Sequence, residues 1–255
     1  MSFKVVIPAR YASTRLPGKP LLEIQGKPMV QWVVDAACQS QADEVLVATD
    51  DVRIMSVLSN PRGIEPMGIM TGTHHLSGTD RIAEVALCQQ WSPDTVVVNV
   101  QGDEPQMPPQ LINQVAQLLL DTPQAHLSTL STPITSLEDF LNPSVVKVVK
   151  ADTGLALYFS RAPIPWYRDC APAGLSSQME FKGAQRHLGI YAYRVAALLR
   201  LTQLEPSALE LAESLEQLRA LQAGMNIAVA TAVTQPGQGV DTPQDIERIR
   251  HHIFQ

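Results

Sequence analysis

The chain has 255 residues, a mass of 27.9 kDa, 45% apolar and 17% charged residues, and a formal net charge of −6. A chain of this length and composition can bury a sizeable core, which excludes a disordered chain or a fibre. No apolar run approaches the ~18 residues that a membrane span requires. The acidic balance argues against broad binding to nucleic acid or to a membrane surface.

Short β-branched runs alternate with longer helical patterns along the chain. Strands are expected at residues 4–7, 44–48, 95–100, 145–149 and 227–232. Helices are expected at residues 29–39, 52–58, 79–89, 109–120 and 242–253. This alternation predicts an α/β fold with a mostly parallel sheet and helices on both faces. Ligands of such sheets bind at the carboxyl ends of the strands, so the loops after the strands are the expected site.

Residues 151–188 break this alternation. Prolines and glycines crowd a segment that still carries Tyr158, Phe159, Trp166 and Tyr167. We therefore expect a single domain over residues 1–255, with this segment as an excursion that covers a cleft or a partner subunit.

A further helical pattern is expected at residues 208–222. Its leucines recur at three- and four-residue spacing and should face inward: Leu211, Leu215, Leu218 and Leu221. Glu210, Glu213 and Glu216 lie on other faces, which predicts a solvated stripe with an ion pair between Glu216 and Arg219.

The cysteines and the N-terminus bear on the compartment. Cys38, Cys88 and Cys170 are widely spaced and have no histidine at metal-ligand spacing. A disulfide framework or a structural zinc site is therefore not expected. The chain enters an apolar strand directly and lacks the features of a secretory leader, so a cytoplasmic location is expected.

The loop after the first strand is basic. It carries Arg10, Arg15 and Lys19 together with hydroxyl groups and Gly18, and residues 1–22 contain no acid. Three cations of this kind suit a polyphosphate. The loop is not a Walker motif, and the chain has no GxGxxG dinucleotide fingerprint. From charge alone, an ordinary solvated basic loop is an equally good interpretation.

Two aspartates follow predicted strands. Asp103 comes after the apolar strand at residues 95–100, and Asp241 comes after the last strand and before Thr242 and Pro243. Two carboxylates at one sheet edge suit Mg²⁺, which fills its octahedron with water and substrate phosphate. Taken separately, Asp103 could close a turn, and the N-cap of the last helix is the better interpretation of Asp241.

Nine sequence blocks resemble those of a known family and follow one another in the same order. They include RYASTRLPGKP at 10–20, SGTDR at 77–81, VNVQGDEP at 98–105, RHLGIY at 186–191 and GVDTP at 239–243, with others at 48–50, 142–148, 158–166 and 215–219. In these blocks the chain resembles the sugar-acid cytidylyltransferases, and among them the branch that acts on 3-deoxy-D-manno-octulosonate (Kdo).

The resemblance implies a Rossmann-like nucleotidyltransferase fold and a homodimer in contact through residues 151–188. It implies transfer of CMP from CTP to Kdo, giving CMP-Kdo and pyrophosphate for lipopolysaccharide biosynthesis. The transfer needs no protein nucleophile, because positioning and charge neutralisation carry it. Alternatives are a different sugar acid, such as an 8-amino-Kdo analogue or a sialic acid, or a nucleotide-binding regulator without catalysis.

The resemblance also assigns residues. The catalytic set comprises Arg10, Arg15, Lys19, Asp103 and Asp241, with the two aspartates holding Mg²⁺. The CTP contacts comprise Pro8, Ala9, Arg10, Arg15, Lys19, Thr49, Asp50, Ser77 and Gly78. The sugar contacts comprise Gln101, Arg161, His187, Tyr191 and Glu213.

Two assigned segments have plain structural interpretations, and two positions depart from the family. Residues 77–80 could simply be a turn with a helix N-cap, and an isolated His187 would more often be a core residue. Gly72 stands where the family often has arginine, and Leu76 stands where it usually has a polar residue. These departures concern the base pocket.

Overall fold

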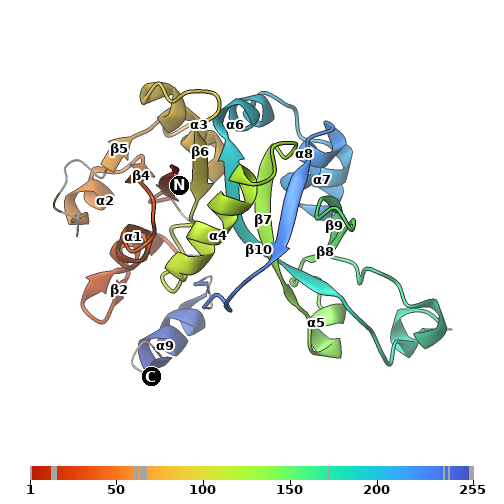
Figure 1. Cartoon of the computed structure of the whole chain (residues 1–255). Helices are drawn as coiled ribbons and strands as arrows, with labels where there is room; N and C mark the ends of the chain where they lie inside the picture. Colours follow the sequence, from red (N-terminus) through yellow and green to blue (C-terminus); the bar gives the residue numbers. More distant parts are fainter. Residues whose placement is uncertain are drawn as a thin grey trace.

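The structure, a computed structural model, describes residues 2–12, 16–59, 63, 68–171, 173–237, 239–240 and 242–252. Within these residues one large sheet is covered by helices (Figure 1). The strands of that sheet are β1 Lys4–Ala9, β4 Glu44–Thr49, β5 Gly68–Met70, β6 Val96–Asn99, β7 Leu127–Pro133, β8 Lys147–Lys150, β9 Ala156–Ser160, β10 Gln185–Arg194 and β11 Ile227–Thr231. A small hairpin is made by β2 Glu23–Ile24 and β3 Lys27–Pro28.

The α-helices lie mostly between the strands along the chain. They are α1 Met29–Cys38, α2 Val52–Val57, α3 Gly78–Cys88, α4 Pro109–Leu120, α5 Leu137–Leu141, α6 Val195–Thr202, α7 Ala208–Glu213, α8 Gln217–Gln222 and α9 Pro243–His252. Short 3-10 helices are η1 Lys19–Leu21, η2 Arg168–Cys170 and η3 Leu175–Ser177. No helix in the described ranges combines the length and apolar character needed to cross a bilayer.

The sheet is mixed, with a parallel half that carries the expected site. Its main path runs β11-β7-β10-β6-β1-β4-β5, and β8 and β9 extend it from β10. The pairs β1 with β4, β1 with β6, β4 with β5 and β7 with β11 are parallel, whereas β10 runs antiparallel to β6, β7 and β8. The predicted α/β class is confirmed, and all five predicted strands are present. The sequence pattern missed β5, β7, β9 and β10.

Helices cover both faces of the sheet because alternate residues of a strand point to opposite faces. Val5 and Ile7 pack with residues of α1 and α4 in one fully buried cluster. Val6 between them packs with residues of α3, α6 and α8 in a second cluster. The near-continuous apolar strands of the parallel half are therefore buried on both sides, as expected for such a sheet.

The carboxyl ends of the parallel strands meet at one edge of the sheet. Residue Ala9 at the end of β1 lies opposite Thr49 at the end of β4, and Val6 lies opposite Asn99 at the end of β6. The loops that follow β1, β5 and β6 therefore start from neighbouring positions. This register brings distant parts of the sequence together.

The segment at residues 151–188 has its ends in the sheet and its middle outside it. Residues 156–160 form β9, and residues 185–188 begin β10. Between them, residues 161–184 extend from the lower right of the sheet beside α5 (Figure 1). The ring of Phe140 in α5 stacks on the ring of Phe181, with centroids 4.9 Å apart. The ring of Tyr167 meets the Phe140 ring edge-on. This segment thus packs on α5 and its neighbours in a small apolar cluster separate from the two main ones.

The single helix predicted at residues 208–222 is wrong. Ser214 has a φ of 51°, in the left-handed region, and ends α7 before α8 begins at Gln217. Because the chain turns there, the leucine stripe is broken: Leu211 is 69% exposed whereas Leu218 is fully buried. The predicted pair between Glu216 and Arg219 is also replaced, since Arg219 donates to Glu210.

Candidate active site

A cleft with a volume of about 360 Å³ opens where the loops after β1 and β6 meet the start of α3. Its lining residues are Pro8, Ala9, Arg10, Lys19, Pro20, Met29, His75, Leu76, Ser77, Gly78, Arg81, Gln101, Gly102 and Asp103. Most of the predicted nucleotide contacts thus face one space, together with Gln101 and Asp103. His75, Arg81 and Met29 line it as well, and the sequence did not identify them.

The basic loop after β1 is closed by a glycine turn. The N–H of Gly18 donates to the carbonyl of Tyr11 at 3.1 Å, and Gly18 has a φ of 68°. A Cβ at this position would lie 3.2 Å from the Tyr11 ring. The guanidinium of Arg53 covers the same ring at 3.4 Å from its centroid. Glycine is needed here for its backbone conformation, and Tyr11 fixes the loop.

Lys19 and Asp103 form an ion pair across the cleft. The Nζ of Lys19 lies 2.7 Å from Oδ2 of Asp103, and the two side chains are 13% and 39% exposed. Asp103 lies within a turn in which the N–H of Glu104 donates to the carbonyl of Gln101. The loops after β1 and β6 approach closely, since a Cβ on Gly102 would lie 2.9 Å from the carbonyl oxygen of Pro8. Asp103 thus lies within a turn and also faces the cleft, and its role as a metal ligand stays a prediction.

The predicted residues Arg15 and Asp241 lie outside the described residues. The segment next to Asp241 is described, and it contacts the Asp103 loop: the N–H of Val240 donates to the carbonyl of Asp103 at 2.9 Å. Beyond it, Thr242 and Asp245 form reciprocal hydrogen bonds at the start of α9, with the N–H and hydroxyl of Thr242 each 2.8 Å from Oδ2 of Asp245. Thr242 therefore occupies the N-cap position of α9, which the sequence pattern alone assigns to Asp241.

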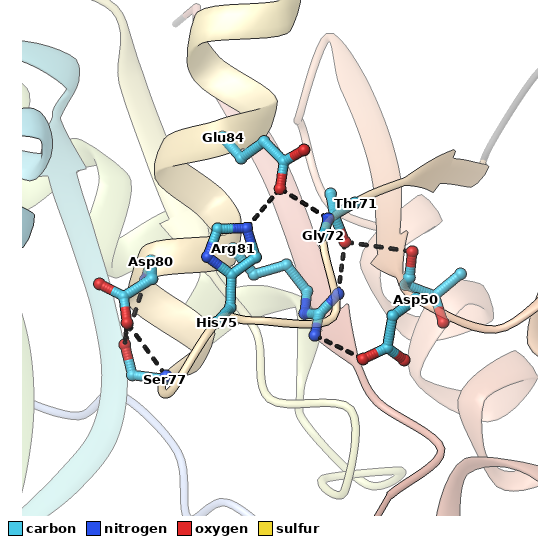
Figure 2. A network of polar contacts seen from close by, with 9 residues as sticks. Asp50, Thr71, Gly72, His75, Ser77, Asp80, Arg81 and Glu84 are labelled. Atoms are coloured by element: carbon cyan, nitrogen blue, oxygen red, sulfur yellow. Dashed lines mark hydrogen bonds and ion pairs between the residues drawn. The ribbon is translucent and has the colours of Figure 1, made fainter.

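The start of α3 is held by a polar network, shown in Figure 2. Ser77 is the N-cap of α3 and forms a capping box with Asp80, as the structural interpretation of this motif predicted. Gly78 lets the helix approach β1, because a Cβ there would lie 3.0 Å from Cγ of Pro8. Capping and lining the cleft are compatible, since the cap leaves backbone N–H groups of the first turn at the cleft.

Thr49 and Asp50 lie behind the cleft and are not among its lining residues. Arg81 is 2% exposed, and its guanidinium donates to Asp50 at 2.8 Å and to the hydroxyl of Thr71. Thr49 is fully buried, and its carbonyl accepts from the N–H of Thr71 at 2.8 Å. In this structure the two residues anchor the cleft wall through Arg81.

The two positions that depart from the family lie in the same wall. Gly72 donates its N–H to Glu84 at 2.9 Å, and a Cβ on Gly72 would lie 2.3 Å from the ring of His74. Leu76 is 89% exposed at the cleft. The ring of His74 thus occupies the space beside Gly72, and the apolar side chain of Leu76 faces solvent at the mouth of the cleft.

Two predicted sugar contacts, Arg161 and Glu213, are hydrogen-bonded to each other at the end of β9. The carboxylate of Glu213 accepts from the hydroxyl of Ser160 at 2.7 Å and from the N–H of Arg161 at 2.9 Å. The guanidinium of Arg161 donates to the carbonyls of Glu213 and Pro143 at 2.6 and 3.0 Å. Glu213 is therefore engaged with protein groups and does not belong to a solvated stripe.

A buried lysine supports this group, and sequence reasoning missed it. The Nζ of Lys147 donates to the carbonyls of Arg161, Val145 and Asn142 at 2.7, 2.7 and 2.9 Å. Burial lowers the pKa of Lys147. The available signal was a lysine within an apolar strand, which is rarely fully buried without partners.

His187 and Tyr191 lie together on β10. Their ring centroids are 5.3 Å apart, and the His187 ring also meets Phe159 edge-on at 5.0 Å. Burial lowers the pKa of His187 to about 3, so the ring is neutral at pH 7. The hydroxyl of Tyr191 is buried without a hydrogen-bond partner among the described residues, and burial raises its pKa well above the ordinary value. An unpaired buried hydroxyl is costly unless something binds it.

A partly buried acid, Glu216, connects the start of α3 to the segment after α7. Glu216 accepts a hydrogen bond from the hydroxyl of Thr79 in the first turn of α3, and burial raises its pKa. Thr79 follows Gly78 directly in the sequence. The nucleotide side of the cleft is thereby joined to the segment that carries Glu213.

The donor set at the cleft fits Mg²⁺. No group of three or more histidine, cysteine or acidic side chains suited to a metal occurs in the part of the chain that the structure describes. Zinc and calcium usually need three or more protein ligands, whereas Mg²⁺ uses one or two carboxylates and completes its shell with water and phosphate. Asp103, with Val240 hydrogen-bonded to its backbone, offers a carboxylate of this kind at the cleft.

Comparisons with known proteins agree with this geometry. The sequence profile of a family described as cytidylyltransferase matches residues 4–227. Proteins named 3-deoxy-manno-octulosonate cytidylyltransferase from Thioalkalivibrio sulfidiphilus and Aeromonas hydrophila are 52% and 53% identical, with 98% of each chain covered. A solved structure of CMP:2-keto-3-deoxy-manno-octonic acid synthetase complexed with CTP is similar at a TM-score of 0.84 and 43% identity, covering 98% of this chain and 97% of that one.

Proposed function

The chain belongs to the cytidylyltransferase family, and from this we propose that it transfers CMP from CTP to Kdo, giving CMP-Kdo and pyrophosphate. The anomeric hydroxyl of the sugar attacks the α-phosphorus of CTP. The bond from that phosphorus to the bridging oxygen breaks, and pyrophosphate leaves with the electron pair. The hydroxyl proton passes to solvent.

One observation carries the proposal: cations, small residues and an acid from three separate loops line a single cleft at the sheet edge. Arg10 and Lys19 come from the loop after β1, Ser77 and Gly78 from the start of α3, and Asp103 from the loop after β6. The cations bind the triphosphate and stabilise the departing pyrophosphate. Arg15, in the same basic loop, is assigned the same role.

Asp103 and Asp241 are proposed to hold Mg²⁺. The hydrogen bond from Val240 to Asp103 supports this, because it brings the residue before Asp241 to the Asp103 loop. When bound, Mg²⁺ neutralises phosphate charge and favours ionisation of a hydroxyl beside it. The ammonium of Lys19, now paired with Asp103, becomes available to a phosphate oxygen when that carboxylate binds a metal.

The sugar side is proposed to comprise Gln101, Arg161, His187, Tyr191 and Glu213. The buried hydroxyl of Tyr191, which has no hydrogen-bond partner in the part of the chain that the structure describes, lies beside a neutral imidazole and suits the hydroxyl groups of a sugar. Arg161 supplies a positive charge for the sugar carboxylate, and Lys147 fixes its backbone. The hydrogen bond from Thr79 to Glu216 holds the segment that carries Glu213 against the start of α3, on the nucleotide side of the cleft.

We also propose a homodimer that works in the cytoplasm in lipopolysaccharide biosynthesis. Residues 161–184 extend from the sheet and carry large exposed apolar side chains, with Trp166, Leu175 and Met179 being 44%, 55% and 77% exposed. Apolar exposure of this kind is typical of a subunit contact. Cys88 and Cys170 are free thiols, which suits a reducing compartment.

The test is a pyrophosphate-release assay with purified protein, CTP and Mg²⁺ against a panel of sugar acids. We expect turnover with Kdo and much slower turnover with an 8-amino-Kdo analogue or a sialic acid. Preference for one of those sugars would redirect the substrate assignment. Binding of CTP without turnover of any sugar would favour the regulator.

A further inference from the structure

His75 lies in the wall of the cleft, on the loop between β5 and α3. The loop is anchored at its start, where the buried guanidinium of Arg81 bonds Thr71, and at its end, where Ser77 caps α3. Between these anchors one side chain, that of Glu84, reaches back from the second turn of the helix. Figure 2 shows the carboxylate of Glu84 pointing at both His75 and Gly72.

Glu84 fixes the orientation of the His75 ring. Its Oε2 accepts from the N–H of Gly72 at 2.9 Å and bonds Nε2 of His75. The two side chains are 30% and 11% exposed, so the contact is partly shielded from water. Burial raises the pKa of Glu84, but the hydrogen bonds from His75 and Gly72, together with the electrostatic interactions with His75 and His74, outweigh burial and leave that pKa below its ordinary value. The carboxylate is therefore ionised at neutral pH.

This contact determines which ring nitrogen carries the hydrogen. An ionised carboxylate can only accept, so Nε2 of His75 must be the donor. A neutral imidazole has a single N–H, which leaves Nδ1 with an available lone pair. In its neutral form His75 therefore presents a hydrogen-bond acceptor at Nδ1, in a cleft whose other polar lining groups include Arg10, Lys19, Ser77, Gln101 and Asp103.

We propose that His75 is a specificity-determining residue that accepts a hydrogen bond from the exocyclic amino group of cytosine at Nδ1, with Glu84 as its positioning residue. The inference rests on the proposed function, which puts CTP in this cleft. Uracil carries a carbonyl oxygen where cytosine carries the amino group, and two acceptors facing each other repel. The pair of His75 and Glu84 thus favours CTP over UTP.

Two substitutions at position 75 separate the roles of the two nitrogens. In H75Q the amide reaches the place of Nε2, so it can keep the donor to Glu84 but lacks the acceptor. In H75N the amide oxygen reaches the place of Nδ1, so it keeps an acceptor but loses the contact with Glu84. E84Q keeps the ring and removes the charge that fixes it. E205Q is the matched control, because Glu205 is exposed and does not line the cleft.

The measurements are the dissociation constants of CTP and UTP by calorimetry, and kcat/KM for each nucleotide with Kdo, at pH 8.5, above the range in which histidines usually titrate. We expect H75Q to weaken CTP binding roughly tenfold while UTP changes by less than about twofold. E84Q should lower the CTP preference by about threefold. H75N should retain more of the preference than H75Q, and E205Q should match the wild type.

Equal weakening of CTP and UTP in H75Q would overturn the inference, because His75 would then act on the shared triphosphate or on the wall. An unchanged preference in both H75Q and E84Q would overturn it too. Wild-type protein that binds neither nucleotide would instead overturn the proposed function. Should H75Q fail to fold, E84Q still decides the matter through its effect on the preference.

Discussion

Replacing Lys19 by methionine should strengthen metal binding in the absence of nucleotide. Lys19 Nζ lies 2.7 Å from Oδ2 of Asp103, the carboxylate proposed to bind the metal. An ammonium and a divalent cation cannot occupy the same carboxylate oxygen, so the metal must displace the lysine. The methionine variant removes that competition and also removes a positive charge beside the ion.

The structure sets the size of this effect. An exposed ion pair contributes ~0.2–1 kcal/mol, and Lys19 is only 13% exposed, so the upper end applies. A contribution of about 1 kcal/mol corresponds to roughly fivefold tighter binding of the metal to the variant. With CTP present the order should reverse, because the variant cannot bind a phosphate oxygen through Nζ. CTP should then bind roughly tenfold more weakly than to the wild type.

Titration of Mn²⁺ followed by the electron paramagnetic resonance signal of the free ion measures the metal affinity directly, and calorimetry measures the affinity for CTP. Lys4→Met is the matched control, because Lys4 pairs with Glu44 at the opposite end of β1 from the cleft. Equal or weaker Mn²⁺ binding to the Lys19 variant without nucleotide would refute the reasoning. Tighter binding to the control as well would reduce the effect to general charge.

Three other changes have defined outcomes. Asp103→Asn should abolish pyrophosphate release and leave the melting temperature nearly unchanged, and a wild-type rate would contradict the metal assignment. Gly102→Ala should destabilise the protein by about 1–3 kcal/mol in urea unfolding and lower kcat/KM, because its Cβ would lie 2.9 Å from the Pro8 carbonyl; an unchanged stability would argue against that close approach. His187 has a pKa of about 3 in the folded protein, below the ~6.5 of an exposed histidine. At a pH between these two pKa values, the imidazole therefore takes up a proton when the protein unfolds. Stability should be full above about pH 6.5 and fall by up to about 2 kcal/mol from pH 7 to pH 5, and His187→Gln should show a smaller fall in the same unfolding measurement; an equal fall in the variant would place the titrating group elsewhere.

The sequence predicted the parallel half of the sheet better than the antiparallel half. The strands β1, β4 and β6 are short apolar runs, and burial on both faces makes such runs easy to identify. Strand β7 is rich in serine and threonine, yet it is almost entirely buried. Its hydroxyls are satisfied by carbonyls, as Ser128 donates to Val115 and Thr129 to Ile190, both at 2.7 Å. A polar pattern can thus belong to a central strand when its partners come from elsewhere in the chain.

Strand β10 was missed for a different reason. Its first residues follow a proline-rich segment, and its pairing with β7 is irregular between Leu188 and Tyr191, beside Gly189. This irregularity interrupts the alternation of side chains that identifies a strand. The break between α7 and α8 was equally hidden, because Ser214 adopts a left-handed conformation that serine seldom takes.

The site could be predicted as far as the sheet edge determines it. Residues directly after parallel strands, such as Arg10, Gln101 and Asp103, reach the cleft because the register of the strands brings their loops together. Contacts between side chains on different elements could not be read from the spacing of residues. Thr49 ends β4 and Asp50 follows it at the same edge, yet Asp50 pairs with Arg81, and Arg81 lines the cleft whereas Asp50 does not. The roles of Arg15 and Asp241 stay predictions.

A crystal structure of the protein with CTP and Mg²⁺, without sugar, tests most directly whether residues 138 positions apart in sequence meet around one ion. We expect a magnesium ion bound by carboxylate oxygens of both Asp103 and Asp241 at about 2.1 Å, with phosphate oxygens completing its shell and Lys19 moved to the triphosphate. An ion bound without either aspartate, or a triphosphate bound away from Arg10 and Lys19, would contradict this expectation.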